Sequence, residues 1–251
     1  MNQTKAIVMA AGKGTRMKSS VPKILLKIKD KTMIGSVVSA LSIPAIEEIT
    51  LIVNPTTQDA IKEVLRDKVN YITQHEQKGT GHAVMCAEEW LKDFSGNVII
   101  FVGDAPFITQ EMVNQLIDSH NKNNNACTMF SAVFENEIPV YGRIIRDQSG
   151  KLVKIIEEKD ATEEEKKIRE VNSSHYCFDC RKLYTALTKT NDRNAQNEYY
   201  LSDVIEIFLN ENEKVEAIPV EHPFFTYGIN TLEELEERML ELKIFRDTHN
   251  A

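Results

Sequence analysis

Two cationic side chains, Arg16 and Lys23, stand in and just after a glycine loop near the start of the chain. The loop reads Ala10-Ala11-Gly12-Lys13-Gly14-Thr15-Arg16-Met17, and Pro22-Lys23 follows it. Glycines let backbone N–H groups approach phosphate oxygens closely, because no Cβ blocks the way. A guanidinium and an ammonium can neutralise a polyphosphate from different sides. The segment therefore predicts phosphoryl or nucleotidyl transfer, in which the enzyme mainly positions groups and offsets negative charge.

Other glycine motifs fit this loop poorly. A dinucleotide fingerprint needs a third glycine where Met17 stands, which disfavours an NAD-dependent oxidoreductase, and a P-loop needs a Gly-Lys-Ser/Thr ending. Taken alone, Gly12 and Gly14 would indicate only a turn.

A carboxylate, Asp104, follows the continuously apolar run Val98–Val102. Such a run is typical of a central strand buried on both faces. An acid just past its end could hold Mg²⁺, which needs only one or two protein ligands and completes its shell with water and phosphate oxygens. The alternative is a turn or cap role in the Asp-Ala-Pro sequence. Together with the glycine loop, the position favours metal binding.

The elements that would position these residues alternate between strand and helix patterns. Four such repeats predict an α/β protein with a largely parallel sheet covered by helices. The repeats are Ala6–Ala10 with Met33–Leu41, Ile49–Val53 with Gln58–Leu65, Val69–Thr73 with Gly81–Leu91, and Val98–Val102 with Gln110–His120.

The second half is less regular and predicts a mixed sheet. Helical patterns recur at Leu201–Leu209 and Leu232–Ile244, and the charged run Lys159–Lys167 predicts a short exposed helix that opens at Asp160 or Thr162. We expect the last helix to pack against the body, with dimerisation as the alternative. The expected strands are Thr128–Val133, Gly142–Arg146, Leu152–Glu157 and Val171–Phe178.

Length and charge limit the classes of partner. A chain of 251 residues fits one domain, and its net charge of −8 disfavours nucleic acid and anionic membranes. Residues 1–31 carry +7 and the rest −15, a pattern that suits a compact polyanion or simply a solvated basic surface. The four cysteines suggest no disulfide framework, and the short first apolar run is neither a membrane span nor a signal peptide, so we expect a cytoplasmic protein.

The motifs together resemble the sugar nucleotidyltransferase superfamily, and most closely the uridylyltransferase half of bifunctional N-acetylglucosamine-1-phosphate uridylyltransferases. The resemblance runs through the glycine loop, Gln74-His75-Glu76-Gln77-Lys78-Gly79-Thr80-Gly81-His82-Ala83, Gly103-Asp104, Tyr141-Gly142-Arg143, Glu157 to Thr162, Glu170-Val171-Asn172, Asn194-Ala195-Gln196 and Glu198-Tyr199-Tyr200. It implies a Rossmann-like three-layer α/β/α fold with a mostly parallel mixed sheet. It also implies one nucleotidyltransferase domain, with residues 1–120 binding the nucleotide and 121–251 the sugar.

The resemblance implies small-molecule partners and Mg²⁺ as cofactor. Uridylyl would pass from UTP to a sugar-1-phosphate, with N-acetylglucosamine-1-phosphate the first candidate; a homo-oligomer is left open. The implied catalytic residues are Arg16, Lys23 and Asp104, and the implied metal ligands are Asp104 and Asn230. The implied nucleotide contacts are Ala10, Ala11, Gly12, Gly14, Thr15, Gln74, Gly79, Thr80 and Gly103, and the implied sugar contacts are Gly142, Glu157 and Asn172.

Several of these residues have ordinary alternatives. Asn230 could be a helix N-cap, Gln74 a polar residue at a strand end and Thr80 a helix cap. His75 and His82 are interpreted as structural, since no nucleophile pairs with them. Cys177 and Cys180 form a lone CxxC motif and are interpreted as buried thiols.

The sequence departs from the family pattern around the acceptor. Ser173-Ser174 replaces Thr-Gly, and Val102 stands where an aromatic residue is frequent. The sugar is therefore open. No hexapeptide repeats of a left-handed β-helix occur up to Ala251, so no acetyl-CoA activity is expected. The rival functions are transfer from CTP, dTTP or GTP to another phosphorylated acceptor, and a silent nucleotide or nucleotide-sugar sensor.

Overall fold

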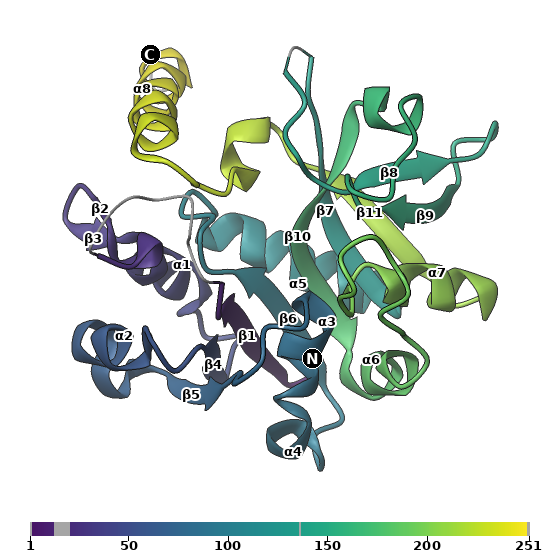
Figure 1. Ribbon diagram of the computed structural model, residues 1–251, viewed down its shortest axis with the longest axis horizontal. Helices are drawn as coiled ribbons and strands as arrows, with labels where there is room; N and C mark the ends of the chain where they lie inside the picture. The colour runs from purple at the N-terminus through teal and green to yellow at the C-terminus, as the bar shows by residue number, and fades with distance from the viewer. Residues whose placement is uncertain (1, 13–20, 136, 250–251) are drawn as a thin grey trace.

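The computed structural model describes residues 2–12, 21–135 and 137–249, and within them a mixed sheet forms the centre of the molecule (Figure 1). Its main path runs in the order β11-β7-β10-β6-β1-β4-β5, and β8 and β9 extend it beside β10. Along this path only β10 runs antiparallel to its neighbours. The strands are β1 (Thr4–Ala10), β4 (Glu48–Val53), β5 (Asn70–Thr73), β6 (Asn97–Val102), β7 (Cys127–Val133), β8 (Arg143–Arg146), β9 (Leu152–Ile156), β10 (Glu170–Asp179) and β11 (Val215–Pro219).

Helices cover both faces of this sheet, which gives three layers. Successive residues of β1 point to opposite faces: Ile7 joins one core, and Ala6 and Val8 join the other. The Ile7 core packs against α3 (Thr80–Met85), α4 (Glu88–Leu91), α6 (Cys180–Leu187) and α7 (Asp203–Asn210). The opposite core packs against α1 (Met33–Leu41), α2 (Gln58–Leu65) and α5 (Gln110–Asn123). The α/β class with a mostly parallel mixed sheet is confirmed.

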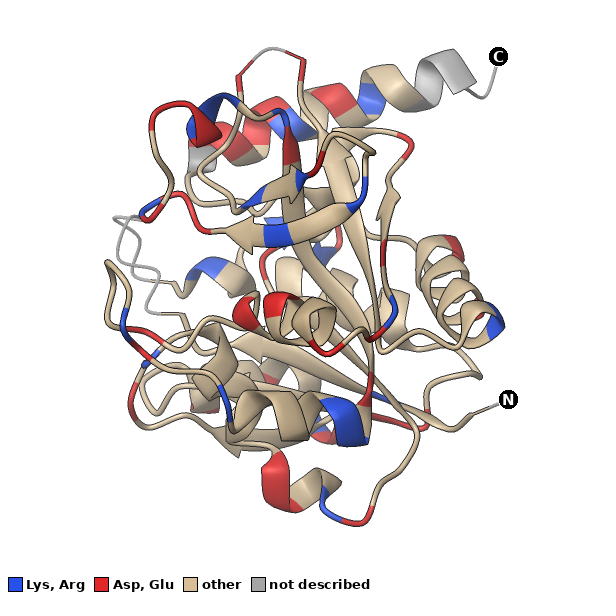
Figure 2. Cartoon of the chain, turned by 90° about the vertical axis from the view of Figure 1, so that its right-hand side faces the viewer, with Lys and Arg blue, Asp and Glu red and all other residues tan. Residues whose placement is uncertain are grey.

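The last helix, α8 (Leu232–His249), packs outside these layers. Its Leu235, Met239 and Leu242 contact a small core built on Phe107 and Phe224. This core also takes in Ile28 from the hairpin of β2 (Lys27–Ile28) and β3 (Lys31–Thr32). Glutamates dominate the first turns of this helix, and basic residues are interspersed with acidic ones further along it (Figure 2). Packing against the body is therefore confirmed. Among the described residues, no helix is both long and apolar enough to cross a membrane.

Two local expectations differ from the structure. The helix expected over Gly81–Leu91 is divided in two: α3 ends at Met85, and α4 begins at Glu88. The charged run forms only the three-residue 3-10 helix Glu165–Lys167, although Thr162 and Glu165 make the reciprocal bonds of a capping box. The chain then turns extended at Ile168 to enter β10, which ends the helix.

Two elements of the second half, α6 and β11, were missed from the sequence. Asp179 caps α6 by accepting a hydrogen bond from Lys182 N at 2.9 Å. Strand β11 is a half-buried edge strand that ends in a proline, so it lacks the apolar run that would mark it.

Cys177 and Cys180 are buried free thiols, as expected.

Candidate active site

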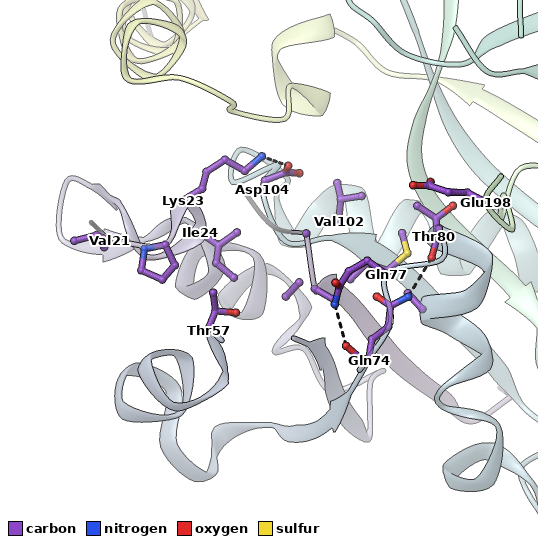
Figure 3. Close-up of a pocket in the computed structure, with 17 residues that line it drawn as sticks. Val21, Lys23, Ile24, Thr57, Gln74, Gln77, Thr80, Val102, Asp104 and Glu198 are labelled. Carbon is purple, nitrogen blue, oxygen red and sulfur yellow. Dashed lines mark hydrogen bonds and ion pairs between the residues drawn. The ribbon is translucent and has the colours of Figure 1, made fainter. Parts of the chain in front are cut away.

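A cavity of about 650 Å³ opens at the carboxyl ends of β1, β5 and β6 (Figure 3). Ligands of parallel α/β sheets bind at this edge, because the strand ends and the loops after them converge there. Eight of the residues expected to bind the nucleotide, the metal or the transferring phosphate line it. They are Ala10, Ala11, Gly12, Lys23, Gln74, Gly79, Thr80 and Asp104.

Three expected catalytic and metal-binding groups meet at the edge of this cavity. Lys23 Nζ lies 2.6 Å from Asp104 Oδ2 and 3.1 Å from Asn230 Oδ1. The ammonium and the carboxylate are both partly buried, with 15% and 29% of their side chains exposed. The helix N-cap role belongs to Thr231, whose hydroxyl accepts from Glu234 N at 3.1 Å, so Asn230 is not the cap. The side-chain amide oxygen of Asn230 accepts a hydrogen bond from Lys23 Nζ instead.

The same two oxygens fit a hard divalent cation. Asp104 Oδ2 and Asn230 Oδ1 both contact one ammonium, so they already converge on a single positive charge. One carboxylate and one amide oxygen suit Mg²⁺, which keeps several waters and binds substrate phosphates. Within the described residues no group of three or more His, Cys, Asp or Glu forms a metal cage. A magnesium site here would therefore be completed by ligands from outside the protein.

A partly buried tyrosine, Tyr141, holds the Asn230 segment against Asp104. Its hydroxyl accepts a hydrogen bond from Gly228 N at 2.7 Å, and Ile229 N donates to the Asp104 carbonyl at 2.9 Å. A Cβ on Gly228 would stand 3.3 Å from Asp104 Oδ1, so glycine permits this close approach. Burial raises the pKa of Tyr141, and the hydroxyl stays protonated. Tyr141 stands in the motif Tyr141-Gly142-Arg143, in which the resemblance implied a role only for Gly142. Its place next to Gly142 was the signal that could have identified it.

Gln74 presents a fixed amide to the cavity. Its side chain is buried, and its Nε2 contacts the Gly79 carbonyl at 3.3 Å and His82 Nδ1 at 2.9 Å. Both amide protons are therefore used, and no described residue donates to Oε1. Gln77, a lining residue that the sequence missed, donates to the Gln74 backbone carbonyl at 3.1 Å (Figure 3). The structure thus gives Gln74 one free acceptor.

The loop at Gly79 packs against the segment that carries Glu198 and Tyr199. Gly79 has φ +102°, and a Cβ there would lie 2.5 Å from the Tyr199 carbonyl oxygen, so only glycine fits. Thr80 is the first residue of α3, and its hydroxyl accepts from Leu201 N at 3.0 Å instead of capping the helix. This contact brings Glu198, another missed residue, into the cavity wall. Its signal was the quoted Glu198-Tyr199-Tyr200 motif.

A second cavity of about 160 Å³ adjoins the first and shares Met9, Thr80 and Glu198 with it. The sugar contacts implied by the resemblance gather around it. Glu157 lines it and accepts from Ser202 Oγ at 2.6 Å. Burial raises the pKa of the Glu157 carboxyl. We name this second cavity the acceptor compartment.

Gly142 and Asn172 lie beside Glu157. Asn172 N donates to the Gly142 carbonyl at 2.8 Å, and a Cβ on Gly142 would stand 3.4 Å from the Glu157 carboxylate oxygens. The Asn172 amide is engaged locally: Nδ2 donates to the Tyr176 hydroxyl at 2.5 Å and Oδ1 accepts from Ser174 N at 3.1 Å. Asn172 therefore shapes the wall of the compartment.

The remaining expected residues either do not line a cavity or fall outside the part of the chain that the structure describes. Gly103 joins β6 to β1, since its N–H donates to the Met9 carbonyl at 2.9 Å. Gly14, Thr15 and Arg16 lie outside the described residues. Lys5, part of the basic N-terminal stretch, lies at the opposite end of β1 and pairs with Glu48 at 2.9 Å. The basic stretch is therefore not one surface.

Comparison with known proteins agrees with this geometry. Residues 5–222 match the model of the nucleotidyl transferase family. The protein named "Bifunctional protein GlmU" from Clostridium botulinum is 46% identical over 92% of this chain and 50% of its own length. The proteins of the same name from Clostridium novyi and Streptococcus uberis are each 44% identical, over 95% and 90% of this chain and 52% and 49% of their own.

This chain spans about half the length of the curated relatives it matches. The resemblance drawn from the motifs is confirmed by the family match and by these relatives. The chain belongs to the nucleotidyl transferase family, and it is a nucleotidyltransferase.

Proposed function

We propose that this chain transfers a uridylyl group from UTP to a sugar-1-phosphate, with N-acetylglucosamine-1-phosphate as the first candidate acceptor. The products are a UDP-sugar and pyrophosphate. The observation that carries the proposal is the pair of adjoining cavities. The larger has Lys23 and Asp104 at its edge, and the smaller is lined by Glu157. Two compartments with a shared wall suit a donor and an acceptor that react where they meet.

The chemistry follows from this arrangement. A phosphate oxygen of the acceptor attacks the α-phosphorus of UTP; that O–P bond forms as the bond to the α,β-bridging oxygen breaks, and pyrophosphate leaves with the electron pair. Lys23 offsets the charge that builds on the phosphates. Arg16 and the backbone of Gly12, Gly14 and Thr15 are assigned the same task on the triphosphate by the resemblance. Asp104 and Asn230 would hold Mg²⁺, which supplies further charge neutralisation when bound.

The side-chain amide of Gln74 is evidence in favour of uracil as the base of the nucleotide. Both of its N–H groups are engaged with Gly79 and His82, so it offers only an oxygen to the cavity. Uracil carries a donor at N3, whereas cytosine carries an acceptor there. An oxygen fixed in this way attracts the first base and repels the second. The geometry therefore favours UTP over CTP.

The lining of the acceptor compartment is evidence in favour of an acceptor with a hydroxylated ring. Glu157 can accept hydrogen bonds from sugar hydroxyls. Gly142 and Asn172 form the adjoining wall through the hydrogen bond that joins their backbones. The absence of a side chain on Gly142 keeps the approach to Glu157 open. These small molecules are the partners that we propose.

A reducing location belongs to the same proposal. The four cysteines are free thiols, which suits the cytoplasm. Measuring the mass of the purified protein with and without a thiol-alkylating reagent, under denaturing conditions, would count them.

The first experiment is pyrophosphate release with UTP, Mg²⁺ and a panel of sugar-1-phosphates that begins with N-acetylglucosamine-1-phosphate. We expect turnover with one preferred acceptor and loss of turnover on chelation of the metal. Turnover with CTP, dTTP or GTP in place of UTP would replace the donor in this proposal. Binding of UTP by calorimetry without any pyrophosphate release would identify a sensor.

A further inference from the structure

The acceptor compartment contains a residue whose backbone conformation is unusual for its type. Ser174 has φ +58°, in the left-handed region that residues with a Cβ rarely adopt. It lies in β10 where the register against β7 shifts: Asn172 faces Ser131, and Tyr176 faces Met129. Two extra residues are therefore accommodated on β10. Such bulges re-aim a side chain, and they often lie next to active sites.

The residues on either side of Ser174 are anchored in the core. Ser173 is 4% exposed and its hydroxyl donates to the Phe130 carbonyl at 2.9 Å. His175 is fully buried and packs edge-on against Phe101, with ring centroids 4.6 Å apart. Ser174 alone of these three is partly exposed, and it lines the acceptor compartment. The left-handed turn between two anchored neighbours directs this residue to the cavity.

Local hydrogen bonds hold this conformation in place. Ser174 N donates to Asn172 Oδ1 at 3.1 Å, while Asn172 Nδ2 donates to the Tyr176 hydroxyl. The Asn172 amide therefore links the backbone of Ser174 to the Tyr176 phenol. Glycine would take this conformation freely, whereas serine stores strain. Strain of this kind is retained where the side chain has a use.

We propose that Ser174 is a specificity-determining residue of the acceptor compartment. Its hydroxyl hydrogen-bonds a polar substituent of the sugar ring, and its Cβ limits how large that substituent can be. The acceptor class is a sugar-1-phosphate whose ring carries a hydroxyl or an acylated amine at the carbon that faces Ser174. This inference rests on the proposed function, because it concerns the second substrate of the same reaction.

The test compares Ser174→Gly and Ser174→Ala with the wild type in the pyrophosphate assay, over acceptors that differ only in one ring substituent. The matched control is Asn212→Gly, since Asn212 has φ +59° and is exposed in the turn after α7. We expect Ser174→Gly to raise the KM of the preferred acceptor ~3- to 10-fold, the effect of one lost hydrogen bond. The KM of UTP should stay unchanged. The Ser174→Ala variant should show the same loss, because it also lacks the hydroxyl.

The substituent preference gives a second readout. Ser174→Gly opens space that Ser174→Ala does not, so only the glycine variant should improve kcat/KM for the bulkier acceptor relative to the smaller one. Its Tm should match the wild type or rise, because relief of strain offsets the larger entropy of glycine in the unfolded chain. The control should leave both KM values and the acceptor preference unchanged.

Two results would overturn the inference. One is a Ser174→Gly enzyme whose acceptor KM and acceptor preference equal those of the control. The other is a parallel rise in the KM of both substrates with a fall in Tm, which indicates a purely structural residue. If wild-type protein turns over no sugar-1-phosphate, the proposed function fails first, and that failure is visible before any variant is made.

Discussion

The two adjoining cavities, the larger one beside Lys23 and Asp104 and the acceptor compartment, position their lining side chains by different means. Around the larger cavity, Ala10 is the last residue of β1, Gln74 follows β5 and Asp104 lies just after β6. Around the acceptor compartment, Glu157 follows an antiparallel strand outside the main path of the sheet, and Ser174 stands in a bulge. The first set is brought together by the regular geometry of the sheet. The second set depends on local irregularities.

Under the proposed function, this difference assigns the two parts of the reaction to two kinds of structure. Carboxyl ends of parallel strands converge whatever the detailed sequence, so in this proposal they provide a stable platform for phosphates and metal. A bulge can change with one or two residues, so it suits recognition of a particular acceptor. Changes in the first region should therefore abolish turnover, and changes in the second should redirect or weaken it. The predictions below test that division.

The largest effect is expected from Lys23→Ala. The ammonium contacts Asp104 and Asn230 at the cavity edge, where the proposed reaction builds negative charge on the phosphates. Its removal should lower kcat by ~100- to 1,000-fold, the usual cost of losing one group that stabilises transition-state charge. Steady-state pyrophosphate release measures this. Lys27→Ala, which changes an exposed lysine of the β2–β3 hairpin, is the matched control and should leave kcat within about twofold. Equal rates for the two variants would remove Lys23 from the mechanism.

A smaller effect, confined to one donor, is expected from Gln74→Ala. Loss of the fixed oxygen should lower kcat/KM for UTP by ~10- to 100-fold and leave kcat/KM for CTP almost unchanged. The ratio of kcat/KM for UTP to kcat/KM for CTP should therefore fall. Gln77→Ala alters a second glutamine of the same cavity and should keep that ratio. A Gln74→Ala enzyme with wild-type preference for UTP would show that the base is read elsewhere.

The same division explains how much of the molecule could be predicted from the sequence. The platform was predictable because its signals are local: apolar strands, helix periods and polar residues just after them. Helices α1 and α2 were predicted with their observed bounds, and Asp104 was placed correctly after β6. Their side chains meet simply because parallel strands end at one edge.

The acceptor compartment was harder to predict, because the types of its residues do not indicate its geometry. Nothing in Ser173-Ser174 indicates a left-handed bulge, since serine is not the residue that such a turn favours. The contact of Tyr141 with Gly228 joins residues 87 positions apart, and periodicity carries no information on such a contact. Glu157, Gly142 and Asn172 came from resemblance alone.

A coupling between the two regions is expected at Tyr141. Its hydroxyl is the acceptor for Gly228 N, so Tyr141→Phe leaves that N–H without its partner beside Asp104. We expect kcat to fall ~3- to 10-fold and the Mg²⁺ concentration for half-maximal rate to rise by a similar factor. Titration of the rate with Mg²⁺ measures both.

The matched control for this variant is Tyr184→Phe. The Tyr184 hydroxyl also makes one backbone contact, to the Val84 carbonyl at 2.9 Å, but α6 lies away from both cavities. The two variants should lose similar stability, and only Tyr141→Phe should change the metal requirement. An unchanged Mg²⁺ dependence in both would show that the segment is held without the tyrosine.

The smallest effect concerns the carboxylates that crowd behind the acceptor compartment. Asp203, the first residue of α7, is half-buried. Burial raises its pKa to about 6, and the charges of Glu157, Glu206 and Asp160 add to the rise. The folded protein therefore keeps a proton that the unfolded chain releases near pH 4.

The sign of the pH dependence follows from this shift. Asp203 contributes stability that is fully present below pH 4 and is lost as pH rises through about 6. The variant Asp203→Asn lacks this loss, so its unfolding free energy relative to wild type should increase from pH 4 to pH 7, by about 1 kcal/mol after screening by solvent. Asp147→Asn should show the opposite slope, because the hydrogen bond from Ser149 lowers the pKa of that exposed carboxyl. Urea denaturation at several pH values measures both slopes. Parallel curves for wild type and Asp203→Asn would mean that the acceptor region carries no such strain, and the contrast between the two regions would then rest on geometry alone.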